Sequence, residues 1–502
     1  MSSLKTNADF FFSDLFFIKL LILFNLLAIL IIVLIPKKYN LLIKQVSILF
    51  SLVFFLISLL LYKSRFVNLL ETGNSFFSSF KILTTIDILN NKIPFCCDNI
   101  SFLLIILTTF LIFVCLLISL ELPEFKLYSI CFFTIELILL VVWTVFDVFL
   151  FYIFFESVLI PMFIIILFWG SRDRKIRAAY LFFMYTVIGS LPMLFSILYI
   201  YSKAGTTNVF LLQLNNFFSF NEQKFLWLTF FLAFAVKVPM VPFHLWLPEA
   251  HVEAPTAGSV ILAGVLLKLG SYGMIRFLNP LFVIGGVYFT PFVQTMSICG
   301  IIYASLTALR QNDLKRIIAY ASIAHMNLIV IGIFSLSIYA MEGAILQMIS
   351  HGLVASLLFL MIGIVYDRSG TRLLKNYSGL TTVMPTFSSY FLIATIANMA
   401  FPGTCNFAGE ILLFLGIFLT NVNTGYLSAI GIFLCATYSI WLYNRMMCGN
   451  ITKEVSNFTD IDYLDVFICR VFIFCILLFG LYPHFATVFI YSDSLYLLSL
   501  NN

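Results

Sequence analysis

Apolar runs of about 20 residues recur along almost the whole chain, and each is long enough to cross a bilayer as an α-helix. The chain has 502 residues, of which 62% are hydrophobic and only 10% are charged. A soluble protein of this length needs far more charge to cover its surface. The sequence therefore predicts an all-α polytopic membrane protein with about 14 transmembrane helices.

The expected crossings follow one another closely, so little of the chain is left for polar loops. They lie at approximately 17–36, 42–62, 99–119, 128–146, 148–169, 178–201, 225–243, 255–277, 281–303, 316–335, 340–365, 382–420, 426–444 and 466–490. The longest polar segments, at 63–98, 202–224 and 366–380, are too short to form a soluble domain. We expect the segment 63–98 to lie along the membrane surface.

Basic residues are concentrated in alternate loops of this arrangement. The clusters lie at 172–177, 310–316, 368–375 and 445–453, after the expected helices 5, 9, 11 and 13. Alternate loops share one side of the membrane, and positively charged loops face the cytoplasm or the matrix. Both termini are therefore expected on the opposite side, although Lys63 and Arg65 do not fit the pattern. The net charge of +5 comes from these short loops and does not indicate nucleic-acid binding.

Prolines interrupt two of the expected helices, numbers 7 and 12. In helix 7, Pro239 and Pro242 follow Lys237, and in helix 12, Pro402 precedes Glu410. Because proline removes a backbone hydrogen bond, we expect free carbonyl groups and access for water beside Lys237. Broken helices in corresponding halves of a membrane protein indicate an inverted repeat with ion sites at the breaks.

An inverted repeat divides the chain into four parts. Helices 4–8 at 128–277 form the first five-helix repeat, and helices 9–13 at 278–445 form the second. Three N-terminal helices at 1–127 precede them, and a C-terminal helix within 446–502 follows.

Seven ionisable residues fall in the middle of expected helices, where each costs about 2.5–3.5 kcal/mol even on a lenient insertion scale. They are Glu136, Glu156, Lys237, Lys268, His325, His351 and Glu410. Burial disfavours the charged forms of lysine and glutamate, so both can exchange protons near neutral pH, where histidine titrates unaided. The set predicts a proton-conducting row, with Glu136 as a secondary member. The alternative is that these charges only fix helix packing.

A group of histidines and glutamates follows the first break. His244, Glu249, His251 and Glu253 resemble a metal-binding pattern, but no cysteine or histidine spacing elsewhere supports one. We expect no metal site, and we interpret this stretch as a membrane-surface turn leading to Lys268. Asp98 and Asp147 stand at helix ends, where they are expected to act as caps or interface residues.

The stretch FAVKVPMVPFHLWLPEAHVEAPTAGSVILAGVLLKLGSYGMIRF at 234–277 is the most specific motif in the chain. It resembles the antiporter-like membrane-arm subunits of respiratory complex I, the proton-pumping NADH:ubiquinone oxidoreductase. The segments at 98–111, 149–170, 310–333, 348–368 and 402–410 are also similar, so the resemblance covers roughly 95–450.

The resemblance implies fourteen helices with inverted repeats over helices 4–8 and 9–13, and specific roles for the buried charges. By position, Glu156 and Lys237 match a pair between helices 5 and 7. Lys268 matches a central lysine, His325 and His351 match central histidines, and Glu410 matches a terminal acid. Related subunits tend to carry a lysine at that last position, so Glu410 favours one particular subunit.

The resemblance also implies a function. The chain is expected to translocate protons as a subunit of NADH:ubiquinone reductase without a redox centre of its own. NAD, FMN, iron–sulfur clusters and ubiquinone belong to the rest of that complex. Expected partners are neighbouring antiporter-like subunits and the lipid bilayer, including cardiolipin. The expected location is the mitochondrial inner membrane, and the 59 phenylalanines suit the T-rich template of an organelle genome. The alternatives are a subunit of a Mrp-type cation/proton antiporter and a membrane scaffold.

Overall fold

The computed structural model describes residues 2–72, 82–88, 91–214, 217–452, 454–456 and 458–499. Lys453, a member of the last basic cluster, lies outside the described residues. The chain forms two compact units. Unit 1 comprises residues 1–168 and 194–218, and unit 2 comprises residues 169–193 and 219–502.

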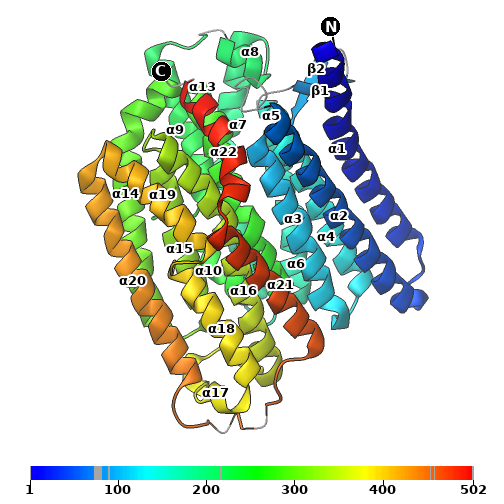
Figure 1. Cartoon of the computed structure of the whole chain (residues 1–502), viewed down its shortest axis with the longest axis vertical. Coiled ribbons are helices and arrows are strands. Elements are labelled where there is room, and N and C mark those ends of the chain that lie inside the picture. The colour runs from blue at the N-terminus through cyan, green and yellow to red at the C-terminus, as the bar shows by residue number, and fades with distance from the viewer. Residues whose placement is uncertain are drawn as a thin grey trace. The chain divides into compact units, whose positions relative to one another are not determined.

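Unit 1 is mainly helical (Figure 1). Its elements are α1 (Ser2–Leu34), α2 (Asn40–Thr72), β1 (Ile82–Ile88), β2 (Asn91–Cys96), α3 (Asn99–Ile118), α4 (Phe125–Thr144), α5 (Val148–Ser157), α6 (Leu159–Trp169), the second part of α7 (Lys175–Ala204) and α8 (Val209–Leu214). Short 3₁₀ turns lie at Lys37–Tyr39 and Ser119–Glu121. Helices α1 to α4 pack on one another through apolar side chains.

The polar residues at the helix ends of unit 1 act as caps. Asp98 forms a capping box with Ser101 at the start of α3. Asp147 accepts hydrogen bonds from the backbone N–H groups of Phe149 and Leu150, at 3.0 Å each. Both aspartates therefore satisfy backbone donors that a helix leaves unpaired, which confirms the prediction of caps.

A β-hairpin is the part of unit 1 that the sequence did not predict. Strands β1 and β2 pair antiparallel, with Ile88 opposite Asn91. They occupy much of the segment 63–98, and α2 continues to Thr72. The prediction of an all-α membrane fold is confirmed, and the hairpin is a short addition to it, where the β-branched isoleucines and threonines of ILTTIDI suit a strand.

Unit 2 contains the remaining helices, with the first part of α7. They are α9 (Phe220–Lys237), α10 (Trp246–Glu253), α11 (Thr256–Ile261), α12 (Leu267–Gly273), α13 (Asn279–Leu281), α14 (Val283–Arg310), α15 (Leu314–Ile333), α16 (Ile338–Ser369), α17 (Leu380–Val383), α18 (Pro385–Asn398), α19 (Cys405–Thr420), α20 (Val422–Met447), α21 (Tyr463–Leu481) and α22 (His484–Ser499). Two π-helical segments, Leu262–Leu266 and Met274–Leu278, flank α12, and a 3₁₀ turn lies at Leu374–Asn376. The C-terminal part thus has two helices instead of the single helix predicted, with the break at Tyr482 and Pro483.

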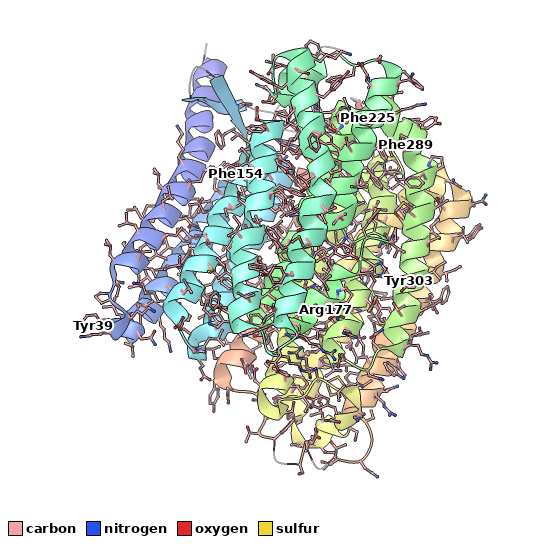
Figure 2. All side chains as sticks on the ribbon, turned by 180° about the vertical axis from the view of Figure 1, so that it is seen from behind. Tyr39, Phe154, Arg177, Phe225, Phe289 and Tyr303 are labelled. Atoms are coloured by element: carbon pink, nitrogen blue, oxygen red, sulfur yellow. The ribbon has the colours of Figure 1, made fainter. Side chains whose placement is uncertain are left out.

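Aromatic side chains hold α9 against α14. The ring of Trp227 stacks on Phe289, with 4.9 Å between centroids. Gly285 allows the close approach, because a Cβ atom there would lie 2.7 Å from Trp227 Cβ. Figure 2 shows Phe225 and Phe289 near one end of these helices, with Tyr303 further along α14.

Eleven helices of the described residues are long and apolar enough to cross a membrane. The expected crossings at 17–36, 225–243 and 382–420 are not among them. The described side chains give only a shorter apolar helix, Ile18–Leu34, for the first, and Cys405–Thr420 for part of the last. The crossings expected at 225–243 and 382–420 contain the predicted breaks. Helix α9 ends at Lys237, and residues 399–404 separate α18 from α19. The predicted interruptions of helices 7 and 12 are thus confirmed.

The basic loops of unit 2 meet at one end of its helices. The backbone N–H of Leu314 donates to the carbonyl of Arg372 at 3.0 Å, and the guanidinium of Arg372 donates to the hydroxyl of Ser171. Similarly, the N–H of Gly379 donates to the carbonyl of Cys448 at 3.2 Å. These contacts gather all four basic segments at one end of unit 2, in agreement with the alternation of charge.

Candidate functional site

Lys237 is the last residue of α9 and is only 5% exposed. The carbonyl of Ala235 accepts from the N–H of Met240, and that of Val236 accepts from the indole N–H of Trp246, both at 2.9 Å. Protein donors therefore occupy these two carbonyls, because the chain folds back after the prolines. The expectation of free carbonyl groups beside Lys237 is therefore wrong for Ala235 and Val236.

Lys268 lies in the first turn of α12, directly after a π-helical segment, and is fully buried. Its Nζ atom donates to the carbonyl of Ala263 at 2.5 Å and lies 2.8 Å from Nδ1 of His351. A π-helical turn is wider than an α-helical one and is often found at functional sites. Here it provides a backbone acceptor for the lysine within its own helix.

His351 connects Lys268 to the second half of the row. It lies in α16, and its Nε2 atom has no hydrogen-bond partner among the described residues. The ring of His325, in α15, lies 5.7 Å from it between centroids. His325 Nδ1 is in turn 3.5 Å from Glu410 Oε1. Four predicted residues from four different helices thus form one continuous buried row.

Close packing of α16 and α19 positions Glu410 at the end of this row. Gly409 lies directly over Gln347, and a Cβ atom there would be 2.5 Å from Gln347 Oε1. Glycine at such a contact lets two membrane helices approach closely. The amide of Gln347 consequently reaches Glu410, with 3.4 Å between Nε2 and Oε1.

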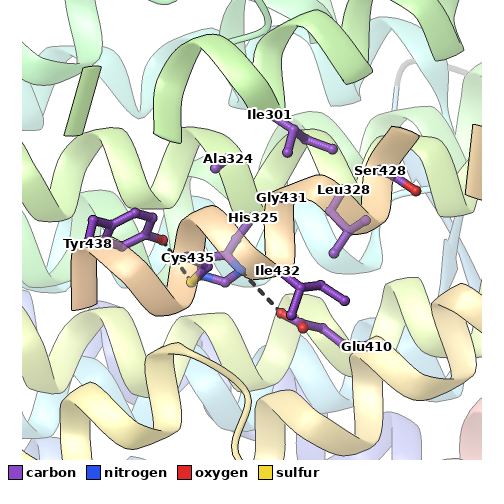
Figure 3. Close-up of a pocket in the computed structure, with 10 residues that line it drawn as sticks. All are labelled: Ile301, Ala324, His325, Leu328, Glu410, Ser428, Gly431, Ile432, Cys435 and Tyr438. Carbon is purple, nitrogen blue, oxygen red and sulfur yellow. Dashed lines mark hydrogen bonds and ion pairs between the residues drawn. The ribbon is translucent and has the colours of Figure 1, made fainter. Parts of the chain in front are cut away.

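A small cavity of about 20 Å³ lies beside His325 and Glu410 (Figure 3). Cys435 and Tyr438 of α20 line it. Cys435 Sγ lies 3.6 Å from His325 Nε2 and 2.9 Å from the hydroxyl of Tyr438. A cavity of this size has room for a single water molecule. His325 therefore contacts a carboxylate and a thiol, and all three groups line one water-sized space.

The stretch after the first break forms a largely buried helix, α10, and not the turn predicted, while its place at the membrane surface stays a prediction. His251 is fully buried and stacks on Phe359, with 4.5 Å between ring centroids. Glu249 forms an ion pair with Arg316, with 2.7 Å between Glu249 Oε1 and Arg316 Nη2. The basic residue Lys315 is buried too and donates to the carbonyl of Ala254 at 2.8 Å. These contacts cover α10, and among the described residues no three His, Cys, Asp or Glu side chains could hold a metal ion.

Glu136 and Glu156 belong to unit 1. Glu136 lies in α4 and is fully buried. Glu156 lies in the last turn of α5, next to the interruption at Val158 between α5 and α6. Since Lys237 belongs to unit 2, the pairing of Glu156 with Lys237 stays a prediction.

The sequence predictions missed two polar residues that contact the row and a third, Tyr438, that contacts one of these two. Gln347, Cys435 and Tyr438 are all buried. Gln347 precedes His351 by four residues and so lies on the same helical face, which is a signal that could have identified it. Cys435 and Tyr438 are not recognisable from the sequence, since cysteine and tyrosine are common in membrane helices.

Comparison with known proteins identifies the class to which this fold and row of residues correspond. The family described as NADH:quinone oxidoreductase/Mrp antiporter, TM, matches residues 146–437. The chain belongs to this family of membrane proteins.

Relatives that match most of the chain share one name, NADH-ubiquinone oxidoreductase chain 4. The relative from Marchantia polymorpha is 50% identical over 466 residues, covering 92% of this chain and 93% of its own. The relative from Chondrus crispus is 48% identical over 480 residues, covering 95% and 96%.

Solved structures show the same fold at low sequence identity. A chain of respiratory complex I from Thermus thermophilus with bound NADH superposes with a TM-score of 0.84 at 23% identity, covering 97% of this chain and 100% of its own. A chain of the Mrp complex from Dietzia sp. gives a TM-score of 0.83 at 16% identity, covering 96% and 99%.

Proposed function

We propose that the chain is a proton-translocating membrane-arm subunit of NADH:ubiquinone oxidoreductase, respiratory complex I. It couples electron transfer from NADH to quinone, carried out elsewhere in the complex, to proton movement across the membrane. The observation that carries the proposal is the buried row Lys268–His351–His325–Glu410, in a chain that is about half identical to proteins named for this enzyme.

The row has the donors and acceptors that a proton relay needs. The contact between Lys268 and His351 has hydrogen-bond length, so a proton passes between them directly. His351 and His325 are further apart, and a water molecule between the rings completes that step. His325 then delivers the proton to Glu410, whose carboxylate stabilises the imidazolium form.

Glu156 and Lys237 control loading of the row. A carboxylate near a lysine favours the charged ammonium, and its withdrawal favours release of the proton. Changes in the Glu156–Lys237 pair would therefore couple events elsewhere in the complex to the protonation of Lys268. Glu136 is a secondary member of the same system.

Protons enter from the side of the basic loops and leave on the opposite side after reaching Glu410. By the positive-inside rule, the side of entry is the matrix, and the chain resides in the mitochondrial inner membrane. The segments 128–277 and 278–445 act as inverted repeats, each with one broken helix. Neighbouring antiporter-like subunits and membrane lipids, including cardiolipin, surround the chain, and NAD, FMN, iron–sulfur clusters and ubiquinone are bound by other subunits.

A subunit of a Mrp-type cation/proton antiporter is the second candidate, because the chain of the Mrp complex has the same fold. Blue-native electrophoresis separates the two. We expect the chain to migrate with NADH dehydrogenase activity in a large complex. Migration in a small complex without that activity would support the antiporter instead.

Substitution of Lys237 by alanine distinguishes transport from a scaffold role. We expect the complex to assemble and oxidise NADH but to pump fewer protons, because Lys237 loads the row. Unchanged pumping by the assembled variant would leave the buried charges with only a structural role.

A further inference from the structure

A cleft of about 460 Å³ opens at the basic end of unit 2, away from the proposed proton row. It is lined by Lys375, from the 3₁₀ turn after α16, and by Arg445, from the last turn of α20. Both side chains are exposed, and neither forms an ion pair with a described carboxylate. Two cations thus face one cleft without an anion between them.

The cleft is held in shape by contacts between two loops. Thr381 donates to the carbonyl of Met447 at 2.9 Å, and Thr452 donates to that of Asn376 at 2.7 Å. Gly379, with φ +73°, fits closely against the second loop, where a Cβ atom would lie 2.9 Å from the carbonyl oxygen of Gly449. The backbone segments that carry the two cations are therefore tied together in advance of any ligand.

One carboxylate also lies near the cleft. Glu454 accepts a hydrogen bond from the amide of Asn376 at 3.0 Å. Among the described residues that line the cleft or bond to its two loops, Lys375 and Arg445 outnumber this acid, so these residues together keep a positive charge.

An apolar groove of about 280 Å³ adjoins the cleft, and Asn444 lines both. Leu392 and Ile396 of α18 form one wall of the groove, and Ile440 and Tyr443 of α20 form the other. Leu392 is 39% exposed and Ile440 is 50% exposed, as expected of side chains that face lipid. A positively charged cleft thus continues into an apolar groove between two membrane helices.

We propose that this composite site binds one anionic phospholipid, with its phosphate between Lys375 and Arg445 and an acyl chain in the groove between α18 and α20. A soluble anion would leave the groove unfilled, and a zwitterionic lipid would bring its own cation to the cleft. The inference specifies one lipid contact of the proposed membrane subunit. It rests on the membrane placement of the chain and not on proton translocation.

Photolabelling of the intact complex tests this site. The complex is placed in phosphatidylcholine vesicles that contain a diazirine-acyl phosphatidylglycerol probe or, in parallel, a diazirine-acyl phosphatidylcholine probe. After illumination, labelled peptides from 385–398 and 422–447 are quantified by mass spectrometry. We expect about 25-fold more labelling by the anionic probe, about fivefold for each of the two cations, and an excess of inorganic phosphate should not reduce it.

Variants assign the preference to the two parts of the site. The double variant Lys375→Gln, Arg445→Gln should lower labelling by the anionic probe about fivefold for each cation removed. Arg310→Gln removes an exposed cation of another basic loop and should not lower it. Ile440→Trp should lower labelling by filling the groove, and Ile430→Trp on the same helix should leave it unchanged. The proposal would be overturned by equal labelling with both probes or by no labelling with either. Displacement of the anionic probe by phosphate, or a preference that survives the double substitution, would also overturn it. NADH oxidation and pumping, measured on the same samples, report the proposed function separately.

Discussion

Lys268 Nζ and His351 Nδ1 lie 2.8 Å apart, in side chains that are 0% and 2% exposed. Two cations could not share so apolar a place without mutual repulsion. One of the two groups must therefore be neutral whenever the other is positively charged. Under the proposed function, this exclusion would let a second proton arriving at Lys268 drive the first towards His325.

Glu410 is expected to be essential, and Gln347 to position it. Glu410→Gln removes the final acceptor, so proton transfer through this chain should slow at least about 100-fold. Gln347→Leu keeps the carboxylate but removes a hydrogen bond to it, and a loss of about tenfold is expected, equivalent to about 1.4 kcal/mol. Proton uptake by vesicles after a pulse of NADH measures both effects.

Gln294→Leu is the matched control, because Gln294 is also buried but does not contact the row. Its pumping should equal that of the unmodified chain. A similar loss in this control would show that removing any buried amide disturbs the helices.

The glycine contact between α16 and α19 should be sensitive to a single methyl group. Gly409→Ala places a Cβ atom 2.5 Å from Gln347 Oε1 and 3.1 Å from Gln347 Cα, so the Gln347 side chain must shift and the two helices must separate slightly. Overpacking of this kind costs about 1–3 kcal/mol of stability. We expect a lower melting temperature in a thermal shift assay of the purified complex.

Gly286→Ala is the comparison, since the nearest atom to its Cβ would be Trp227 Nε1 at 3.7 Å. It should leave the melting temperature unchanged or raise it slightly, because alanine favours a helix by about 1 kcal/mol over glycine. Equal losses in both variants would contradict close packing at Gly409.

Asp460 should make the start of α18 sensitive to acid. Partial burial raises the pKa of Asp460, but hydrogen bonds from Thr386, Ile461 and Phe387 outweigh burial and hold this pKa below its ordinary value. The stabilisation is therefore present above the unfolded pKa of about 3.9 and is lost as the pH falls through the folded pKa. Asp460→Ala should cost about 0.5–2 kcal/mol at pH 7, as for other helix caps.

Hydrogen exchange of the amides at 385–398 measures this effect. Protection should fall in Asp460→Ala at pH 7. The difference from the unmodified chain should shrink as the pH falls below about 3.9 and vanish below the folded pKa of Asp460. An effect of the substitution that does not shrink with falling pH would exclude the carboxylate as its cause.

The predictions that succeeded rest on large energetic costs. A charge in the middle of a bilayer is expensive, so Lys268, His325, His351 and Glu410 stand out in an apolar sequence, and the structure brings them together. Proline likewise identifies the break after Lys237 because it cannot donate a backbone hydrogen bond.

The predictions that failed depend on packing, which leaves little trace in one sequence. The contacts of Cys435 with His325 and Tyr438 exist only because α20 packs beside α15. In α10, the pattern of polar residues suggested a turn, but the stretch is a helix in which Glu249 pairs with Arg316 and His251 stacks on Phe359, both from other helices. Partners so far away in the chain cannot be recognised from local composition.

The most direct test of the proton row is the ratio of protons pumped to electrons transferred in vesicles that contain the complex with Lys268→Met. Methionine fills the same space but cannot carry a proton, so NADH oxidation should continue while the ratio falls by the whole contribution of this chain. Lys203→Met, at an exposed lysine of α7, should keep the normal ratio. A normal ratio in Lys268→Met would contradict proton transfer through the row.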